Sequence, residues 1–186
     1  MSDRAEVINE STVRFTRRFQ ASQEQVWDFL VNPQKRKLWL CAGDWELDPR
    51  GRATMIFDNQ ALSDPDDHPP RRYADDRVVH EGQLRSVEPP HFLELLWVEH
   101  DGSRSEVRVE LEREQSEVVL RLTHSKLTNQ DMLSGVCAGW HAHLDRWLAV
   151  AHGLEPPSFW SRFNELAEAV YGHRIDTDPA DAGSPN

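Results

Sequence analysis

The sequence has little cysteine and no long apolar run. Its 186 residues include two cysteines, Cys41 and Cys137. They lack the close spacing of a redox or metal-binding pair, so we expect two reduced thiols packed in the interior. No segment approaches the roughly 18 apolar residues that a membrane-spanning helix needs, and the charged start MSDRAEVINE does not resemble a signal peptide. These absences predict a cytoplasmic protein that has no contact with a membrane.

Basic residues are also scarce. The chain has 21 Lys and Arg against 32 Asp and Glu, which gives a formal net charge of -11 at pH 7. Binding to a phosphate backbone needs clustered Lys and Arg, so we expect no nucleic-acid partner. The basic cluster at residues 35–37, Lys-Arg-Lys, is interpreted as the solvated end of a helix.

The longest helix that the sequence supports is predicted over residues 133–153. At 3.6 residues per turn its apolar side chains form one broad stripe, while Asp145 and Arg146 are expected to face away from it. Gly153 and the prolines that follow predict the end of the helix. The stripe consists of Leu133, Val136, Cys137, Trp140, Leu144, Trp147, Leu148 and Ala151. We expect this stripe to be buried.

The region before this helix has the alternation of half-buried strands. A strand at residues 12–20 is followed by two short helices, at 22–31 with a capping box between Ser22 and Gln25, and at 33–40. Six further strands are predicted at 43–48, 52–57, 77–89, 91–100, 105–113 and 117–127. Because helices do not alternate with these strands, a doubly wound parallel sheet is not expected.

An antiparallel sheet with one apolar face needs a cover, and the helix at 133–153 is long enough to provide it. We therefore predict an α+β helix-grip fold. In it a curved antiparallel sheet of about seven strands wraps around a long C-terminal helix, with two short helices after the first strand and one extra C-terminal helix. The predicted organisation is a flexible N-terminus at 1–11, the helix-grip domain at 12–153, a helical extension at 154–175 and a disordered tail at 176–186.

Two segments leave alternatives open. Residues 59–76 are rich in Asp and Pro and have no sustained period, which suits a mobile lid, a binding loop or simple disorder. A helix that Ser158 can cap has an apolar face; it either packs on its own domain or forms a homodimer through residues 158–171.

Histidines are the first candidates for chemistry. His141 and His143 are two residues apart on the predicted helix and point in nearly opposite directions, so we expect no metal site; no cofactor is expected either. His80 and His124 lie on strand faces that carry apolar residues. Each is either a hydrogen-bonded interior histidine or a polar anchor for a ligand. The nucleophile elbow, phosphate loop and dinucleotide fingerprint are all missing from the sequence, so no catalytic residue is assigned.

Aromatic residues are plentiful, with seven Trp and seven Phe. Most would contribute to the core in any arrangement, and Trp27 and Trp147 are expected to do so. The side chains expected to line a cavity between sheet and helix are Trp39, Trp45, Phe57, His80, Trp97, His124, Trp140 and Leu144.

Four stretches, in this order, are similar to one protein family. RFTRRFQASQEQVWDFLVNPQKRKLWL carries a Val-Trp in its first helix and a Pro-then-Trp pattern in its second. GQLRSVEPPHFLELLW has a Gly-containing strand that ends at Glu-Pro, then Trp97. The others are LRLTHSKL and the Gly139-Trp140 pair. Together they resemble the activator of Hsp90 ATPase homologue-like family of the START/polyketide-cyclase superfamily. A Gly-Gly turn frequent in that family is replaced here by Pro49-Arg50-Gly51.

The resemblance implies a ligand-binding helix-grip domain, and three functional hypotheses follow. The first is non-catalytic binding of a small hydrophobic molecule, aromatic or lipid-like, between sheet and long helix. The second is a protein-interaction module with a chaperone or another protein as partner, similar to the co-chaperone that stimulates Hsp90. The third is a cyclase or hydrolase with a His or Glu in the cavity.

Overall fold

One antiparallel sheet forms the centre of the computed structural model, which describes residues 4–74, 77–98 and 102–172. Its strands are β1 (Glu6–Asn9), β2 (Thr12–Phe19), β3 (Arg52–Asp58), β4 (Arg77–Glu88), β5 (Phe92–Val98), β6 (Arg104–Glu114) and β7 (Glu117–Ser125). Their order in space is β1-β2-β7-β6-β5-β4-β3. The predicted tail at 176–186 and the last two residues of the strand predicted at 91–100 lie outside the described residues.

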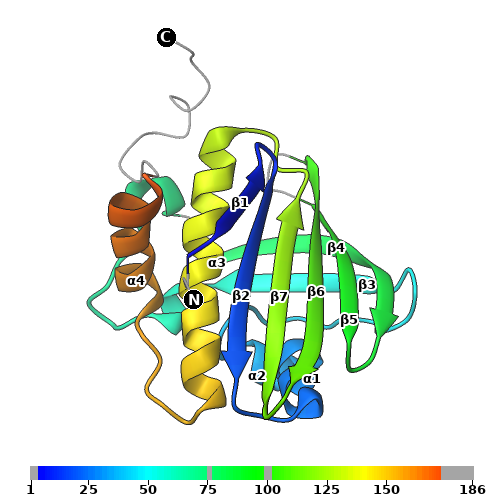
Figure 1. Ribbon diagram of the computed structural model, residues 1–186. Coiled ribbons are helices and arrows are strands. Elements are labelled where there is room, and N and C mark those ends of the chain that lie inside the picture. Colours follow the sequence, from blue (N-terminus) through cyan, green and yellow to red (C-terminus); the bar gives the residue numbers. More distant parts are fainter. Residues whose placement is uncertain (1–3, 75–76, 99–101, 173–186) are drawn as a thin grey trace.

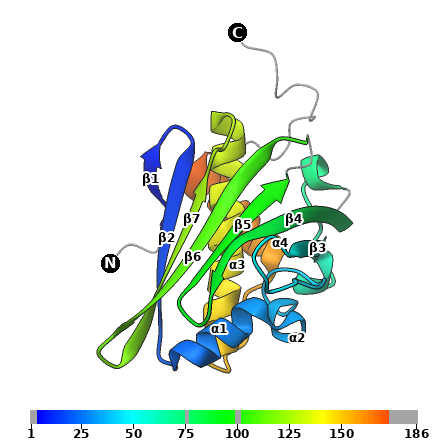
Figure 2. The same ribbon diagram turned by 90° about the vertical axis from the view of Figure 1, so that its right-hand side faces the viewer.

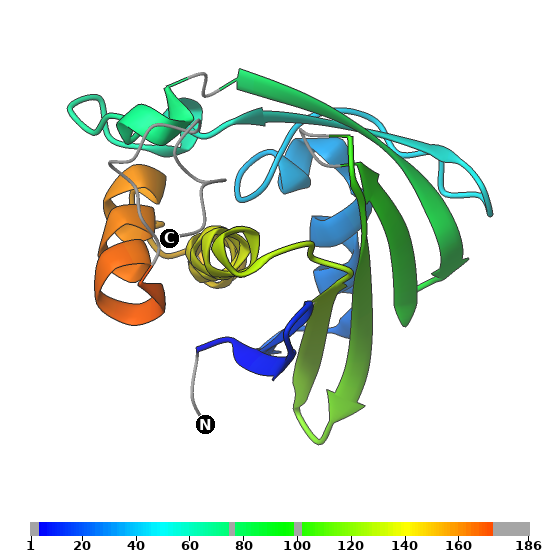
Figure 3. The same cartoon turned by 90° about the horizontal axis from the view of Figure 1, so that it is seen from above.

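Four α-helices accompany the sheet: α1 (Gln23–Val31), α2 (Pro33–Arg36), α3 (Gln130–Ala151) and α4 (Phe159–Leu166). The sheet curves around α3, while α4 lies on the far side of α3 (Figure 1, Figure 3). Helices α1 and α2 sit at one end of the curved sheet (Figure 2). The predicted helix-grip fold is confirmed. In the described part of the chain, no helix is long and apolar enough to cross a membrane.

Alternation along the strands places one apolar face against α3. In β2, for example, Val13, Phe15 and Phe19 are buried and their neighbours are more exposed. Strands of period two and a helix of period 3.6 therefore turn their apolar side chains towards the same interior. Each large side chain that is fully buried there contributes roughly 1.5–3 kcal/mol.

Local capping signals set the helix ends. Ser22 and Gln25 form the predicted capping box of α1: the Ser22 hydroxyl accepts from the Gln25 N–H at 3.2 Å, and the Gln25 side chain accepts from the Ser22 N–H at 2.8 Å. Helix α3 begins three residues before the predicted start because the Asn129 side chain caps it. It ends as expected next to Gly153, which has a φ of +67°.

The first third of the chain differs from prediction in three places. The segment predicted as a strand at 43–48 makes an isolated bridge between Trp45 and Ala53 and no regular strand. The seventh strand is β1, in the segment assigned to a flexible N-terminus; its four residues are all exposed, so no apolar alternation marks it. The helix predicted at 33–40 ends at Arg36 and continues as turns.

The interpretation of residues 35–37 as a solvated helix end is wrong for Arg36. Its side chain is completely buried and donates hydrogen bonds to the carbonyls of Val31 (3.0 Å) and Gly43. The guanidinium also lies 4.0 Å from the centre of the Trp45 ring. Burial lowers the pKa of Arg36. This arginine ties the end of α1 to the segment that leads into β3.

Helix α3 is covered on two faces, which corrects a second expectation. Arg146, expected to face solvent, is 7% exposed and donates to the Pro157 carbonyl. Asp145 pairs with Arg17 at 3.3 Å and with Arg162 at 2.9 Å. The periodicity of α3 identifies its apolar stripe but cannot show that α4 and the preceding loop cover the polar side.

Helix α4 builds a second, smaller core on the outer side of α3. The two alanines of α3 that face it are one turn apart and allow close approach. The residues of this core are Leu62, Ala138, Ala142, Phe159, Trp160, Phe163, Leu166 and Ala167. Of the two placements considered for this segment, the structure has packing on the chain's own domain. A homodimer contact through 158–171 stays a prediction.

The Asp- and Pro-rich segment is ordered over residues 59–74, so the disorder alternative is wrong for this part. It contains 3-10 helices at Gln60–Leu62 and Arg71–Tyr73. Asp67 accepts hydrogen bonds from the hydroxyls of Ser158 and Ser161. Tyr73 packs edge-on against Phe163 with ring centres 5.2 Å apart. The segment lies against α4 because these few contacts hold it there.

Candidate functional site

Aromatic and histidine rings from the strands and from α3 meet in one cluster, here named the open cluster. Its members are Phe57, His80, Trp97, His124, Trp140 and His143. Trp97 is central, with ring centres 5.6 Å from Phe57 and His80 and 5.9 Å from His124 and Trp140. These separations are in the range of aromatic contact.

Strand register brings the open cluster together. Trp97 of β5 pairs with Gly82 of β4 on one side and with Ser105 of β6 on the other. His80 lies two residues before Gly82 and His124 pairs with Val107, two residues after Ser105. Residues two apart in a strand share a face, so His80, Trp97, Ser105 and His124 all face α3.

The hydrogen bonds of His124 define its tautomer. The indole N–H of Trp140 can only donate, and it lies 3.0 Å from Nδ1 of His124, so Nδ1 accepts. The proton of the neutral ring is therefore on Nε2, which donates to the hydroxyl of Ser105 at 2.7 Å. The three side chains form one directed chain of hydrogen bonds from helix to sheet.

This direction matters because a Ser-His pair at 2.7 Å resembles a nucleophile with its base. A general base must present an unprotonated nitrogen to the hydroxyl. Here Nε2 of His124 carries the proton, and Trp140 occupies the position where a carboxylate would hold the opposite tautomer. The arrangement orients His124 and does not activate Ser105.

His143 faces the same cluster from α3. Its Nδ1 lies 2.7 Å from the Trp39 carbonyl and must donate to it. Burial lowers the pKa of His143 to about 3, so the ring is neutral at physiological pH. Its ring centre is 6.1 Å from that of Phe57 and 4.4 Å from that of Phe159 at the start of α4.

Three rings of the open cluster are buried but keep a small exposed fraction. Phe57, Trp97 and Trp140 keep 7–8% of their surface exposed. At Gly139, one residue before Trp140, an added Cβ would have no neighbour within 4 Å. On a helix, Gly139 falls within about 100° of both Trp140 and His143, on the side that faces the cluster. The surface of α3 next to Trp140 and His143 is therefore open at the half-buried Gly139.

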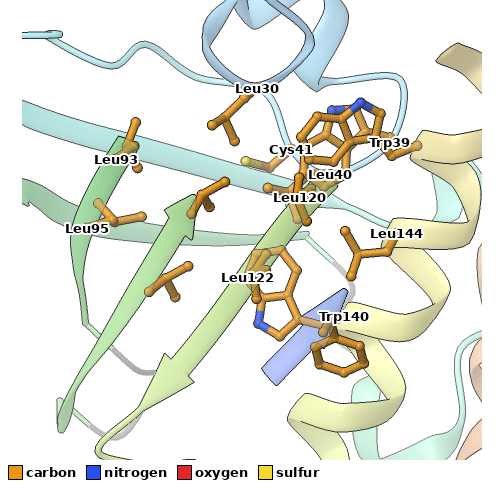
Figure 4. Close-up of a cluster of buried hydrophobic side chains, with 14 of the residues drawn as sticks. Leu30, Trp39, Leu40, Cys41, Leu93, Leu95, Leu120, Leu122, Trp140 and Leu144 are labelled. Carbon is orange, nitrogen blue, oxygen red and sulfur yellow. The ribbon is translucent and has the colours of Figure 1, made fainter. Parts of the chain in front are cut away.

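The structure places the eight predicted site residues in two groups. Phe57, His80, Trp97, His124 and Trp140 come together in the open cluster. The remaining three lie elsewhere: Trp39 stacks on Trp147 at 4.1 Å, Trp45 lies under Arg36, and Leu144 is fully buried. Figure 4 shows Leu144 and Trp140 pointing from α3 towards Leu120 and Leu122 of β7.

Sequence reasoning missed three contributors to the site, Ser105, His143 and Phe159. His143 could have been found, because it lies three residues after Trp140 and so on the same side of the helix. Ser105 could also have been found, because it alternates in phase with the inward-facing Val107 and Val109. Phe159 carries no comparable sequence signal, since it reaches the cluster through the packing of α4.

Metal and thiol chemistry have no support in the described residues. No group of three His, Cys, Asp or Glu side chains in them could hold a metal ion. Cys41 and Cys137 are both buried and unbridged, and burial raises the pKa of each thiol to about 12. Such thiols pack as small apolar groups.

Solved structures similar to this chain support the same architecture. The solution structure of the protein encoded by gene BPP1335 from Bordetella parapertussis is 31% identical, with 95% of this chain and 92% of that chain covered and a TM-score of 0.77. The crystal structure of CalU16 from Micromonospora echinospora is 22% identical, covers 91% and 92%, and has a TM-score of 0.65. A conserved protein of unknown function, EF2215 from Enterococcus faecalis, is 18% identical, covers 94% and 93%, and has a TM-score of 0.64.

No curated protein matches the sequence. The model of one protein family, described as activator of Hsp90 ATPase homolog 1-like protein, matches residues 20–152. This range contains most of the strands, the helix α3 and every member of the open cluster. The chain belongs to the activator of Hsp90 ATPase homologue 1-like family.

Proposed function

We propose that the protein binds a small hydrophobic molecule, aromatic or lipid-like, at the open cluster between the sheet and α3, without catalysing a reaction on it. The observation that carries the proposal is the group of aromatic rings that keep 7–8% of their surface exposed, on the same side of α3 as the open position at Gly139. An apolar molecule that covers these rings gains roughly 25 cal/mol for each Å² that it removes from water.

The composition of the site favours an aromatic occupant. The open cluster presents ring faces and edges from Phe57, Trp97 and Trp140, and offset or edge-on ring contacts contribute about 0.5–1.5 kcal/mol beyond area burial. The site also holds a few placed polar groups, which is typical of small-molecule sites. The direction of the hydrogen bond between His124 and Ser105 supports binding over hydrolysis.

The test compares the wild type with two variants at one position. The neutral dye N-phenyl-1-naphthylamine, which fluoresces strongly in apolar surroundings, is titrated into the protein. We expect saturable enhancement with the wild type and with Gly139→Ala, and at least tenfold weaker binding with Gly139→Leu, whose side chain would fill the space beside Trp140. Native mass spectrometry of protein purified from cells then searches for a natural ligand.

The protein-interaction hypothesis predicts a different result. A module that binds a chaperone or another protein through an outer surface would give no saturable dye response, or the same response with Gly139→Leu as with the wild type. Either outcome would contradict binding at the open cluster.

A further inference from the structure

We propose that the open cluster selects a neutral aromatic molecule that carries a hydroxyl group, such as a phenol, and discriminates against an ionised carboxylate on the same ring system. This inference rests on the proposed function and adds the chemical class of the ligand. It follows from the donor and acceptor capacity that remains on three polar groups of the cluster after their hydrogen bonds to the protein.

The first group is His80. Its Nδ1 lies 2.7 Å from the carbonyl oxygen of Val98. A carbonyl can only accept, so Nδ1 carries the proton of the neutral ring and Nε2 presents a lone pair. The ring is in edge-on contact with Phe57, with centres 5.6 Å apart, and at the same distance from Trp97. His80 therefore offers a hydrogen-bond acceptor at the edge of the cluster.

The second group is His143, to which the same argument applies. Its Nδ1 donates to the Trp39 carbonyl, so Nε2 is again an acceptor. Burial disfavours the charged form of this ring, and the pKa of about 3 keeps the lone pair available at neutral pH. Two histidines of the cluster thus present acceptors, one from the sheet and one from α3.

The third group is the indole N–H of Trp97, which is a donor. It is buried and has no acceptor among the described residues. Three other buried indole nitrogens also have no acceptor there, those of Trp45, Trp147 and Trp160, but these lie outside the open cluster. An unpaired buried donor costs about 1–3 kcal/mol, and a ligand oxygen that accepts from it would remove this cost.

A hydroxyl group matches this arrangement of one donor and two acceptors. Its proton can be donated to an imidazole nitrogen while its oxygen accepts from the Trp97 N–H. A carboxylate has no proton to donate, and its oxygens would face the lone pairs of the histidines. In the described part of the chain, no cation lies over a ring of the open cluster; the four cation–ring contacts involve Phe15, Phe29, Trp45 and Phe92. Arg146 acts electrostatically on His143, but its guanidinium donates to the carbonyls of Pro157 and Leu38. A carboxylate would therefore lose its hydration without an ion pair to replace it.

The experiment measures the dissociation constants of naphthalene, 2-naphthol and 2-naphthoate for the full chain at pH 7 by calorimetry. These probes share one ring system and differ in a single group. One or two net hydrogen bonds of about 1 kcal/mol each predict 2-naphthol to bind about five- to thirtyfold more tightly than naphthalene. We expect 2-naphthoate to bind at least tenfold more weakly than 2-naphthol.

Two variants locate the effect and one serves as control. Trp97→Phe removes the donor and His80→Phe removes an acceptor while each keeps an aromatic ring, so both should lower the ratio of the naphthalene and 2-naphthol dissociation constants towards one. Trp45→Phe also removes an unpartnered indole N–H, but outside the cluster, and should leave the ratio unchanged.

The outcomes separate this inference from the proposed function. If naphthalene binds but 2-naphthol binds no more tightly, or if 2-naphthoate binds as tightly as 2-naphthol, the inference is overturned and the proposed function stands. If none of the three probes binds, the proposed function fails and the inference fails with it.

Discussion

The middle and the C-terminal part of the apolar stripe of α3 each present a tryptophan to the interior, in different surroundings. At one end Trp147 stacks on Trp39 at 4.1 Å, and neither ring is exposed. Two turns earlier, about 10 Å along the helix, Trp140 faces Trp97 in the open cluster, where both rings stay partly exposed and histidines replace aliphatic neighbours. The C-terminal part of α3 is therefore core, and its middle borders the candidate binding site.

The comparison shows how side chains along one helix can be completely buried at one level and keep a small exposed fraction at another. Helix α4 has two contacts with α3. Phe159 reaches His143 in the open cluster, and the other apolar residues of α4 cover the face of α3 that points away from the sheet. A few partly exposed rings are tolerated because each contact that they lack lowers the free energy of unfolding by little compared with the contribution of the whole core.

The largest effect on stability is expected from truncation of Trp147, in the completely buried part of the stripe. Trp147→Ala should lower the free energy of unfolding by about 3–5 kcal/mol, because it leaves a cavity against Trp39 that the surroundings cannot fill. Trp97→Ala should lower the free energy of unfolding by at least about 1 kcal/mol less than Trp147→Ala does, because the Trp97 ring is already partly exposed. Urea denaturation of both variants measures the difference, and a larger cost for Trp97→Ala would contradict the comparison.

Acid should destabilise the protein through protonation of His143 in the open cluster. Its pKa is about 3 in the folded state against an ordinary value of 6.5, so the unfolded state takes up a proton first as the pH falls. Stability is fully present above pH 6.5 and is lost towards pH 3, by about 2 kcal/mol between pH 6.5 and 4.5 for this group. His143→Asn keeps a donor for the Trp39 carbonyl and should reduce the loss by that amount in unfolding curves at the two pH values.

Other groups titrate in the same range, so the decisive quantity is the difference between wild type and variant. An equal loss of stability in both proteins would show that His143 does not provide the acid sensitivity.

A smaller gain is expected at Gly139. An interior helical glycine costs roughly 0.5–1 kcal/mol relative to alanine, and the added Cβ has no neighbour within 4 Å to meet. Gly139→Ala should therefore raise the midpoint of thermal unfolding. A lower midpoint would mean that the space beside Trp140 is filled.

The smallest effect is expected from Trp45→Phe. Trp45 was predicted from the sequence to line the cavity, but its ring lies under Arg36 and outside the open cluster. The affinity for N-phenyl-1-naphthylamine should stay within about twofold of the wild-type value, less than the effect of one net hydrogen bond. A larger change would extend the site towards the segment that leads into β3.

The architecture could be predicted because it depends on periodicity. Alternation in β2 and β6 and the stripe on α3 each identify a buried face, and an antiparallel sheet with one apolar face requires a cover. Arg146 was misplaced because periodicity within one helix contains no information about a second layer of helices. Arg36 was misplaced for a related reason, since its buried position depends on carbonyl groups that tertiary structure brings to it.

The site could be predicted only in part. Strand alternation was enough to point Phe57, His80, Trp97 and His124 inward, and helix periodicity did the same for Trp140. The sequence gives no reason to separate Trp39 from the site residues. In the structure Trp39 stacks on Trp147 and so belongs to the closed core. The side chains that pack against each tryptophan decide whether it belongs to the core or to the open cluster. These neighbours are known only once the sheet and the helix are placed against each other.

The most direct test of ligand binding at the open cluster is a titration of the ¹⁵N-labelled protein with N-phenyl-1-naphthylamine, followed at the indole N–H signals of its seven tryptophans. We predict that the signals of Trp97 and Trp140 shift and saturate, while those of Trp39 and Trp147 stay in place. Shifts confined to Trp39 and Trp147, or no shift of any indole signal at saturating dye, would contradict the account.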